Sequence, residues 1–357
     1  MFYINMLGGG GAERVMCNLA NDFSSRGYEV YLVASFPSQK EYVLSEKIPK
    51  FYLEDADRKV TFLRRNLGRV RKLRKLCKKV KPDVLCGFMA EPNFRVLAAA
   101  IGTKIKTIIS VRNDPNQEYA GTINRFLAKT FFLRADGCVF QTKEAKEWFP
   151  KKIQRKSTII INQVAEQFFL ECSSEENKDA LVSVGRLSKQ KNHHMLIDAF
   201  AKVAEEFPDV CLKIYGDGAL KEELNKYISE MRLDRRVILA GSVKDVPSVL
   251  SNCRGFILSS DYEGMPNTLL EAMTMGCPSI STDCPCGGSH AVIENGKNGL
   301  LVPVKNAECM ATAIRKNLSD REFACVLGEN AKMTALSFHP QNTFSKWEKY
   351  ICEVWNK

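Results

Sequence analysis

Short runs of apolar and β-branched residues alternate along the chain with longer segments whose apolar residues recur every three or four positions. The short runs predict buried strands and the longer segments predict amphipathic helices. This alternation is typical of βαβ units, so we expect an α/β protein with parallel sheets. The predicted strands span residues 2–6, 30–34, 84–88, 107–111 and 137–140 in the first half, and residues 180–184, 210–215, 237–240, 255–259 and 279–281 in the second.

The length of the chain indicates more than one domain. A chain of 357 residues exceeds what one hydrophobic core usually serves. The pattern is interrupted over residues 163–178, which are polar and acidic and are typical of a connection between domains. We therefore predict domains over 1–164 and 179–340, followed by a helix over 341–357 whose regularly spaced apolar residues dock on an apolar surface.

Composition excludes several classes of protein. With 45% hydrophobic and 26% charged residues, the chain is typical of a folded protein and not of a disordered one. No run approaches the roughly 20 apolar residues of a membrane-spanning helix, and no secretion signal is evident, so we expect a cytoplasmic protein. The thirteen cysteines are scattered, which argues against a disulfide framework. Cys284 and Cys286 alone are poor evidence for zinc, and no metal site is expected.

The positive charge of the chain is local. Of the net charge of +11, twelve cations lie between Arg58 and Lys81, where no acidic residue occurs, and the rest of the chain sums to −1. Apolar residues at helical spacing in this segment predict one amphipathic helix with basic flanks, whose apolar stripe packs on its own domain: Leu63, Leu67, Val70, Leu73, Leu76 and Val80. Residues 58–81 form either a solvated face, a surface for anionic lipid or a non-specific phosphate-binding surface. We favour an anionic membrane surface and expect no specific nucleic acid.

Two places in the second half carry residues suited to a phosphate ligand. In open parallel sheets, ligands bind beyond the carboxyl ends of the strands. Directly after the strand at 180–184 come Arg186, which offers a planar fork of donors, and Lys191, a compact positive charge; together they suit a diphosphate. After the strand at 210–215, Gly216 and Gly218 permit either a tight turn or a close backbone approach to a ligand.

A third place combines two carboxylates with the start of a helix. Asn267 is expected to cap a helix over 268–275, which presents amide groups and partial positive charge to an anion. Glu263 precedes this helix and Glu271 lies in its early turns. Carboxylates accept hydrogen bonds from paired hydroxyls, so one can bind a sugar while the other binds a ribose.

These motifs resemble those of the retaining glycosyltransferases of family 4. The run from Glu263 to Met273 resembles their Glu-x7-Glu signature, and the Gly-Arg-Leu, Tyr-Gly-Asp-Gly and Asn-Gly-Leu-Leu-Val-Pro motifs follow in the same order. Near the start, the loop from Gly9 to Val15 resembles the acceptor-side glycine loop. The resemblance implies a GT-B fold, in which two Rossmann-like domains face a central cleft, the donor binds the C-terminal domain, and the last helix crosses back to the N-terminal domain.

The resemblance also implies roles for individual residues. Arg186 and Lys191 would bind the donor diphosphate, Glu263 the hydroxyls of the transferred sugar and Glu271 the ribose, with Arg186, Lys191 and Glu263 forming the catalytic set. Preorganised cations then stabilise the charge that grows on the leaving diphosphate, so no metal ion or other cofactor is expected. Further substrate contacts are expected from Gly10 and Gly11 on the acceptor side, and from Gly216, Gly264, Met265, Pro266, Asn267 and Thr268.

Two positions depart from the family pattern. Arg112 occupies a position where many relatives carry a histidine, and it is assigned to substrate binding, while Ala291 stands where an acidic residue is often found. The pattern is similar to that of transferases extending polyprenyl-diphosphate-linked glycans for surface polysaccharides. We therefore expect a UDP-hexose or UDP-N-acetylhexosamine donor, a glycan or polyprenyl-diphosphate-linked acceptor, and a peripheral position on the inner face of the cell membrane.

Three other functions remain as alternatives. A nicotinamide dehydrogenase requires a third glycine where Glu13 stands, and a ribose-binding carboxylate that the second strand lacks. Asp55 and Asp57 could form a metal-binding Asp-x-Asp, for which sensitivity to EDTA is the test. A catalytically silent membrane- or nucleic-acid-binding protein on the same fold is the third alternative, and the intact Arg186, Lys191, Glu263 and Glu271 argue against it.

Overall fold

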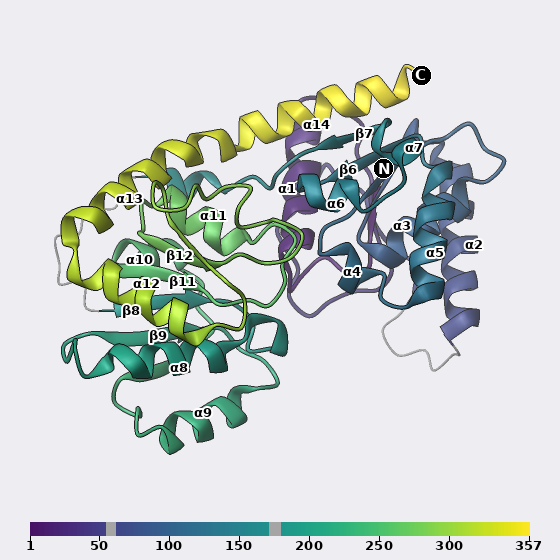
Figure 1. Ribbon diagram of the computed structural model, residues 1–357. Helices are drawn as coiled ribbons and strands as arrows, with labels where there is room; N and C mark the ends of the chain where they lie inside the picture. The colour runs from purple at the N-terminus through teal and green to yellow at the C-terminus, as the bar shows by residue number, and fades with distance from the viewer. Residues whose placement is uncertain (55–61, 171–179) are drawn as a thin grey trace. The chain divides into compact units, whose positions relative to one another are not determined.

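A computed structural model describes residues 1–54, 62–170 and 180–357. The chain divides into two compact units, an N-terminal unit of Met1–Gln163 with Gln341–Lys357 and a C-terminal unit of Val164–Pro340. In each unit a parallel sheet is flanked by helices (Figure 1). The predicted class, α/β with two parallel-sheet domains, is therefore confirmed.

The N-terminal unit is built on a sheet of order β3-β2-β1-β4-β5-β6-β7. The order reverses between β1 and β4, so the loops that follow these strands border a crevice of the kind in which open α/β sheets bind ligands. The strands are β1 (Phe2–Ile4), β2 (Leu32–Ala34), β3 (Lys50–Tyr52), β4 (Val84–Phe88), β5 (Lys106–Ser110), β6 (Gly137–Phe140) and β7 (Ser157–Ile159).

The helices of this unit cover the sheet and end with the last helix of the chain. They are α1 (Gly11–Ser25), α2 (Phe62–Val80), α3 (Ala90–Ala100), α4 (Pro115–Glu118), α5 (Thr122–Phe131), η1 (Phe132–Arg134), α6 (Lys143–Glu147), α7 (Lys151–Gln154) and α14 (Pro340–Trp355). Trp347 of α14 is fully buried with its ring stacked on Phe88 at 5.5 Å, and the Tyr350 hydroxyl accepts a 2.8 Å hydrogen bond from the Cys138 amide. The C-terminal helix therefore packs in the core of the N-terminal unit.

The C-terminal unit has a sheet of order β10-β9-β8-β11-β12-β13. Here the order reverses at β8 and β11, which are hydrogen-bonded neighbours although they are far apart in sequence. The strands are β8 (Ala180–Val184), β9 (Cys211–Tyr215), β10 (Val237–Gly241), β11 (Cys253–Leu258), β12 (Ser279–Thr282) and β13 (Leu300–Val302). The helices are η2 (Glu166–Phe169), η3 (Lys189–Lys191), α8 (His193–Ala204), α9 (Lys221–Glu230), α10 (Val246–Ser251), α11 (Asn267–Thr274), α12 (Ala307–Ser319), α13 (Arg321–Ala335) and η4 (Leu336–Phe338).

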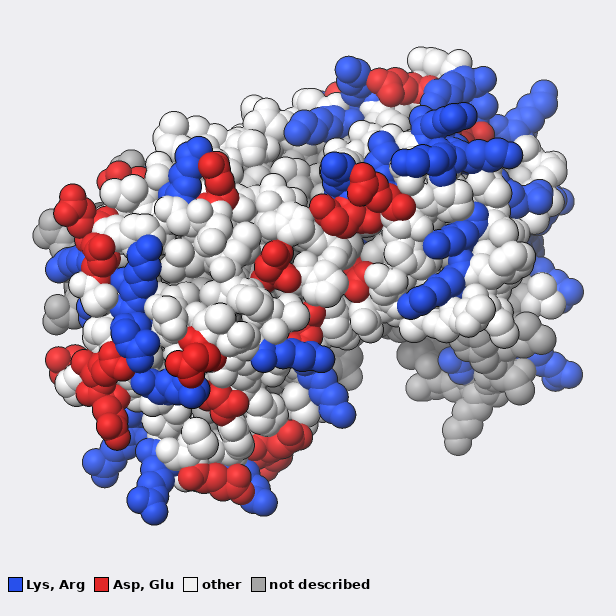
Figure 2. Space-filling view, in the orientation of Figure 1, with Lys and Arg blue, Asp and Glu red and all other residues white. Residues whose placement is uncertain are grey.

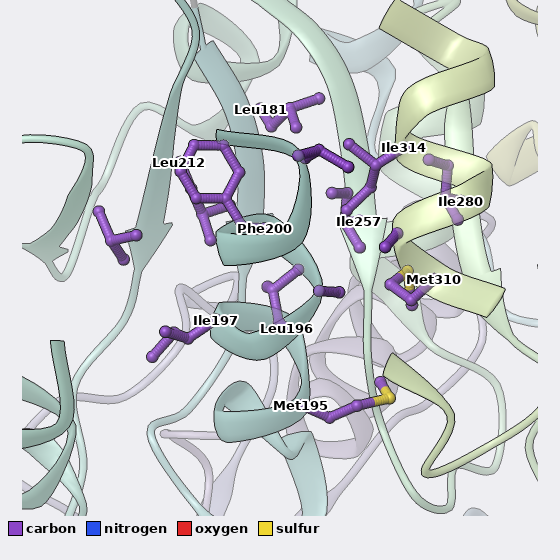
Figure 3. Packing of buried hydrophobic residues seen from close by; sticks show 14 of the residues in the cluster. Leu181, Met195, Leu196, Ile197, Phe200, Leu212, Ile257, Ile280, Met310 and Ile314 are labelled. Atoms are coloured by element: carbon purple, nitrogen blue, oxygen red, sulfur yellow. The ribbon is translucent and has the colours of Figure 1, made fainter. Parts of the chain in front are cut away.

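A dense apolar layer holds α8 and α12 against this sheet. Phe200 and Leu196 of α8 and Ile314 of α12 lie among inward-facing strand residues such as Leu212 and Ile257 (Figure 3). All five side chains are at most 1% exposed. This layer fixes the strands, and thereby the loops at their carboxyl ends.

Most predicted elements are confirmed and a few are corrected. All ten predicted strands are present, with ends shifted by up to two residues, and β3, β7 and β13 were not predicted. The basic helix is α2, and its residues Leu73 and Cys77 are buried as the apolar stripe requires. The prediction is wrong for Leu67, which is 49% exposed. No helix of the described part of the chain is long and apolar enough to cross a membrane.

Candidate functional site

The loop after β8 carries the first part of the site. It runs through Gly185 to the short helix η3, in which Lys191 is the last residue. A Cβ atom on Gly185 would lie 3.0 Å from Cε and 3.3 Å from Cδ of Lys191, so the aliphatic stem of Lys191 crosses over this glycine. A larger side chain at position 185 would displace the stem. The glycine therefore positions the ammonium group at the carboxyl end of β8.

The Lys191 ammonium meets the Glu263 carboxylate at the switch point of the sheet. Lys191 Nζ donates to Glu263 Oε1 at 2.6 Å, and the Ser260 hydroxyl donates to the same oxygen at 2.7 Å. The Gln190 amide donates to the other oxygen at 3.4 Å. The Lys191 and Glu263 side chains are 14% and 10% exposed, which leaves them largely desolvated and strengthens their attraction.

Hydrogen bonds between the two loops fix this pair. The Asn192 amide donates to the Asp261 carboxylate at 2.7 Å, and the Asp261 backbone N–H donates to the Gln190 carbonyl at 2.8 Å. The Ser259 hydroxyl donates to the Lys191 carbonyl at 2.8 Å. Both loops are therefore held by groups that do not themselves need to contact a ligand. This arrangement preorganises a cation and an anion side by side.

The sequence motifs gave no role to Ser260, Gln190 or the Asn192–Asp261 pair. Ser260 and Asp261 lie two and three residues after the end of β11, which was the available signal for a functional position. Ser260 bonds to Glu263 three residues on, whereas the partners of Asp261 lie about 70 residues away along the chain, and nothing local in the sequence indicates which ones they are.

The glycine turn after β9 packs against the loop after β8. Gly216 has φ of +149°, and a Cβ atom there would lie 1.8 Å from the Gly185 carbonyl oxygen. The Leu187 N–H donates to the Asp217 carbonyl at 3.0 Å. Gly216 is therefore required for the close approach of two backbone segments that position Lys191, whatever it contributes to a ligand.

The predicted cap of α11 is wrong. Asn267 is the first residue of the helix, and Pro266 occupies the N-cap position with extended dihedral angles. Because proline has a fixed φ and no N–H, the chain enters the helix one residue earlier than the asparagine cap required. Gly264 and Met265 are buried beside this start, and a Cβ atom on Gly288 would lie 1.7 Å from the Gly264 carbonyl oxygen.

The first turn of α11 keeps the features that suit an anion. A helix start leaves its first amides without partners within the helix and carries partial positive charge. The Thr268 hydroxyl oxygen is buried and has no hydrogen-bond partner among the described residues. Glu271 is 2% exposed and lies one turn after Asn267 on the same face of the helix.

Arg186 lies at the surface and does not contact the Lys191–Glu263 ion pair. Its side chain is exposed and forms no hydrogen bond or ion pair with any residue that the structure describes. Its backbone carbonyl instead faces the buried His193 ring, whose Nε2 lies 3.3 Å away. The structure thus brings Lys191 and Glu263 together, and leaves the Arg186 guanidinium turned to solvent.

Burial lowers the pKa of His193 to about 4, so the ring is neutral in the folded protein. Its pKa in the unfolded chain is near 6.5, and the unfolded chain therefore binds more protons between these values. We expect the free energy of unfolding to fall between pH 6.5 and pH 4, by at most about 3 kcal/mol from this residue. Urea unfolding at pH 7 and pH 5 measures this loss.

The His193→Asn variant is the comparison for that experiment. Asparagine does not titrate, so the variant should lose less stability than the wild type between the two pH values. Equal losses in the two proteins would contradict a role for the ring in this pH dependence.

In the N-terminal unit, the predicted glycine loop lies between β1 and α1. Gly10 is the N-cap residue of α1 and Gly11 is its first residue. Gly9 has φ of +89°, and a Cβ atom on Gly8 would lie 1.6 Å from the Lys40 carbonyl oxygen. Gly10 and Gly11 therefore sit at the carboxyl end of β1, next to the switch point of their own sheet.

Arg112 follows β5 and is buried in an aromatic pocket of this unit. Its guanidinium lies 4.0 Å from the Phe88 ring centroid and 5.5 Å from that of Trp347, and its Nη1 donates to the Asn162 side chain at 3.0 Å. Its Nε and Nη2 have no hydrogen-bond partner among the described residues. Burial lowers the pKa of Arg112 to about 9 and raises that of nearby Glu118 to about 8.

The cysteines of the described residues form no disulfide. Asp55 and Asp57 lie outside the described residues. The described cysteines are all free thiols, and Cys284 is buried with its Sγ donating to the Ser260 carbonyl at 3.1 Å. Cys284 therefore packs behind the Ser260 loop.

A cavity of about 530 Å³ opens at the end of the N-terminal sheet that lies opposite the switch-point crevice. It is lined by the segment that leads from α3 into β5 and by Arg134 and Asp136. Because it lies at the amino ends of β5 and β6, it is not the crevice in which this class of sheet binds ligands.

Two family models match the chain in succession. The model for glycosyltransferase family 4 matches residues 9–165, and the model for glycosyl transferases group 1 matches residues 166–334. The boundary between the two matches lies within two residues of the division between the two compact units.

Individual proteins are similar over all or part of the chain. A Campylobacter jejuni N-acetylgalactosamine-N,N'-diacetylbacillosaminyl-diphospho-undecaprenol 4-alpha-N-acetylgalactosaminyltransferase is 29% identical, with 94% of each chain covered. An Escherichia coli UDP-Gal:alpha-D-GlcNAc-diphosphoundecaprenol alpha-1,3-galactosyltransferase is 31% identical over 44% of this chain and 41% of its own. The crystal structure of Anabaena HepE in complex with UDP-glucose has a TM-score of 0.82 at 18% identity, covering 99% of this chain and 98% of HepE.

Proposed function

Because the chain belongs to the glycosyltransferases that join a family 4 domain to a group 1 domain, with the GT-B fold, we propose that it transfers a sugar from a UDP-sugar to a lipid-linked glycan. The donor would be a UDP-hexose or UDP-N-acetylhexosamine, and the product would serve surface polysaccharide or glycan assembly. The names of the Campylobacter and E. coli relatives support the donor and the diphospho-undecaprenol acceptor.

The observation that carries this proposal is the 2.6 Å contact between Lys191 and Glu263. In a nucleotide sugar, one oxygen joins the sugar to the diphosphate, so a phosphate-binding cation and a sugar-binding carboxylate must be neighbours. Lys191 has three N–H donors and uses one on Glu263, which leaves two for phosphate oxygens. Glu263 is fixed by Ser260 and can accept hydrogen bonds from sugar hydroxyls.

The proposed chemistry is electrostatic. As the bond to the diphosphate breaks, negative charge grows on the leaving group, and Lys191 and the start of α11 place positive charge where it develops. We propose that Arg186, now exposed, adds a second cation when the donor is bound, and that Glu271 binds the ribose. The transfer proceeds with retention at the anomeric carbon and without a metal ion.

The acceptor belongs to the N-terminal unit in this proposal. Gly10 and Gly11 present the start of α1 to a phosphate or hydroxyl group. Arg112 keeps two unpaired donors in its aromatic pocket, which suit an acceptor or donor hydroxyl. The basic α2 faces anionic lipid, which places the enzyme at the inner face of the cell membrane, where a polyprenyl-linked acceptor is found.

Ligand-dependent stability tests the donor site first. A nucleotide that binds the native protein at a hundred times its dissociation constant should raise the free energy of unfolding by about 2.7 kcal/mol. We expect this increase for UDP and for UDP-sugars, measured as a shift of the thermal transition, and a smaller one for GDP and ADP.

Sugar transfer to a polyprenyl-diphosphate-linked acceptor then tests the reaction, with and without EDTA. Product that forms equally in both conditions, with an α-linkage by NMR, supports the whole proposal. Loss of transfer in EDTA would favour a metal-dependent scheme. Absence of stabilisation by every nucleotide tested would contradict the proposed donor site.

A further inference from the structure

Helix α5 exposes an apolar face that no described part of the chain covers. Ile123, Phe126 and Leu127 are 75%, 66% and 44% exposed. Positions separated by three and four residues lie on one face of a helix, so these side chains form a single patch. The one buried residue of α5 is Ala128. Contiguous exposed apolar patches of this kind mark interaction surfaces.

The unit holds α5 by its last turn and not by this patch. The ring of Phe131 lies 6.0 Å from Phe94 of α3, and the ring of Phe132, just after α5, lies 5.0 Å from it. Phe132 also packs on Tyr119 and Phe149 in a buried aromatic cluster. The patch residues contribute little to this packing. Polar residues in their place should therefore leave the fold intact.

The residues around the patch are basic. Between Glu118 and Asp136 the chain has no acidic residue, and it carries three cations, Arg125, Lys129 and Arg134. The Arg125 and Arg134 side chains are exposed. Apolar residues bordered by cations are typical of helices that lie in the interface of an anionic bilayer, with the apolar side among the acyl chains and the cations at the headgroups.

Helix α2 adds a second basic surface to the same end of the unit. Some of its cations serve the protein itself, such as Arg69, which pairs with Glu54 at 3.0 Å, and Arg74, which donates to the Ile101 carbonyl at 2.6 Å. The others point outward from one face of the helix: Arg64, Arg71, Lys75, Lys78 and Lys79. This exposed set is free to attract anions.

Both elements flank α3. Helix α2 packs along α3, and η1, the turn that ends α5, contacts α3 as well. Figure 2 shows Lys and Arg side chains beside uncharged residues at the end of the N-terminal unit where Figure 1 places α2 and α5. The apolar patch and the basic face therefore belong to the same compact unit.

We infer that α5 is an interfacial membrane anchor, which inserts Ile123, Phe126 and Leu127 into an anionic bilayer while α2 attracts its headgroups. The inference deepens the proposed function, on whose lipid-linked acceptor it rests, by assigning the apolar contact to a segment outside 58–81. A bilayer fits the patch better than a protein partner, because its apolar layer lies directly beneath a sheet of negative charge, matching the basic residues on both helices.

Vesicle sedimentation of the full-length protein tests the anchor. We expect binding to phosphatidylcholine vesicles that contain phosphatidylglycerol, and weak binding to phosphatidylcholine alone. The double variant Ile123→Ser with Phe126→Ser should lower the partition constant by roughly a hundredfold, since each large apolar side chain is worth about one factor of ten. This loss should persist at high salt, because apolar insertion is not screened.

Two further variants separate the electrostatic contribution to vesicle binding from the apolar one. Lys75→Gln with Lys78→Gln should weaken binding at low salt and match the wild type at high salt, because only charge attraction is lost. The matched control is Val326→Ser with Met333→Ser on α13, where the side chains are 47% and 68% exposed, and it should bind vesicles like the wild type. Circular dichroism confirms that each variant is folded.

The inference is overturned if the α5 variant sediments like the wild type, if the α13 variant loses as much binding, or if the wild type binds no vesicles. The thermal shift produced by UDP measures binding at the donor site independently of the membrane, and it should be unchanged in the α5 variant. If no nucleotide stabilises the wild type while vesicle binding depends on Ile123 and Phe126, the proposed function is wrong and the anchor stands. If UDP stabilises the wild type while vesicle binding does not depend on Ile123 and Phe126, the anchor is wrong and the proposed function stands.

Discussion

Replacing Lys191 with methionine is expected to lower kcat/KM for sugar transfer by roughly 10²- to 10³-fold. Methionine keeps much of the stem that crosses Gly185 and removes the ammonium group 2.6 Å from Glu263. The charge on the leaving diphosphate then lacks a preorganised partner in a largely desolvated site, where water screens it poorly. Steady-state kinetics over a range of donor concentrations measure the effect.

Lys189→Met is the matched control for this experiment. Lys189 belongs to the same short helix but its side chain is exposed, so its loss should leave kcat/KM unchanged. Glu263 keeps its hydrogen bond from Ser260 when Lys191 is replaced, and urea unfolding shows whether the variant remains folded. Wild-type turnover in Lys191→Met would show that the Lys191 ammonium group does not take part in the reaction.

Replacing Trp347 with alanine is expected to lower the free energy of unfolding of the N-terminal unit by about 3 to 5 kcal/mol. The side chain is fully buried, stacks on Phe88 and belongs to the same core as residues of β1, α1 and β4. The substitution leaves a large cavity beneath the last helix and removes one of the two rings beside Arg112. Urea unfolding followed by circular dichroism measures the loss.

Trp355→Ala provides the comparison on the same helix. Trp355 is the last residue of α14 and is 52% exposed, so its replacement should change stability far less. Similar losses in the two variants would mean that α14 does not form part of the core of the N-terminal unit.

The two glutamates of the motif differ in how the structure presents them. Glu263 is fixed from three sides by Lys191, Ser260 and Gln190. Glu271 lies deeper, within the second turn of α11, and is 2% exposed. The sequence places both near the start of one helix, and the fold presents Glu263 at the switch point of the sheet.

Sequence patterns were sufficient for the central strands and for α2. A central strand of a parallel sheet is covered on both faces, so it is a run of apolar residues visible by itself, as in β4 and β8. The edge strands β3, β7 and β13 are three residues each and pair on one side. Lys50 and Tyr52 of β3 are exposed, so the chain shows no apolar run there, and only the neighbouring strand decides that these residues pair.

The candidate site was predictable as a set of positions and not as a geometry. Motif spacing identified Lys191, Glu263 and Glu271, because Lys191 and Glu263 lie in loops after strands that the sequence reveals and Glu271 lies in the helix that comes next. That Lys191 reaches Glu263 while Arg186 remains at the surface depends on β8 lying beside β11, a pairing set by packing between distant segments. The start of α11 was also mispredicted. Asn267 suits the N-cap position, but in the structure the extended Pro266 occupies it, so that Asn267 is the first residue of the helix.

The sequence by itself determined the α/β class, the family and the identity of the chemical groups, because these follow from local periodicity and short motifs. Tertiary structure decided which groups meet and which apolar residues remain uncovered. Trp347 and Phe126 look alike in an amphipathic pattern, yet one is fully buried and the other is 66% exposed. The physical reason is that burial belongs to a residue together with its distant neighbours, and no local pattern records whether those neighbours are present.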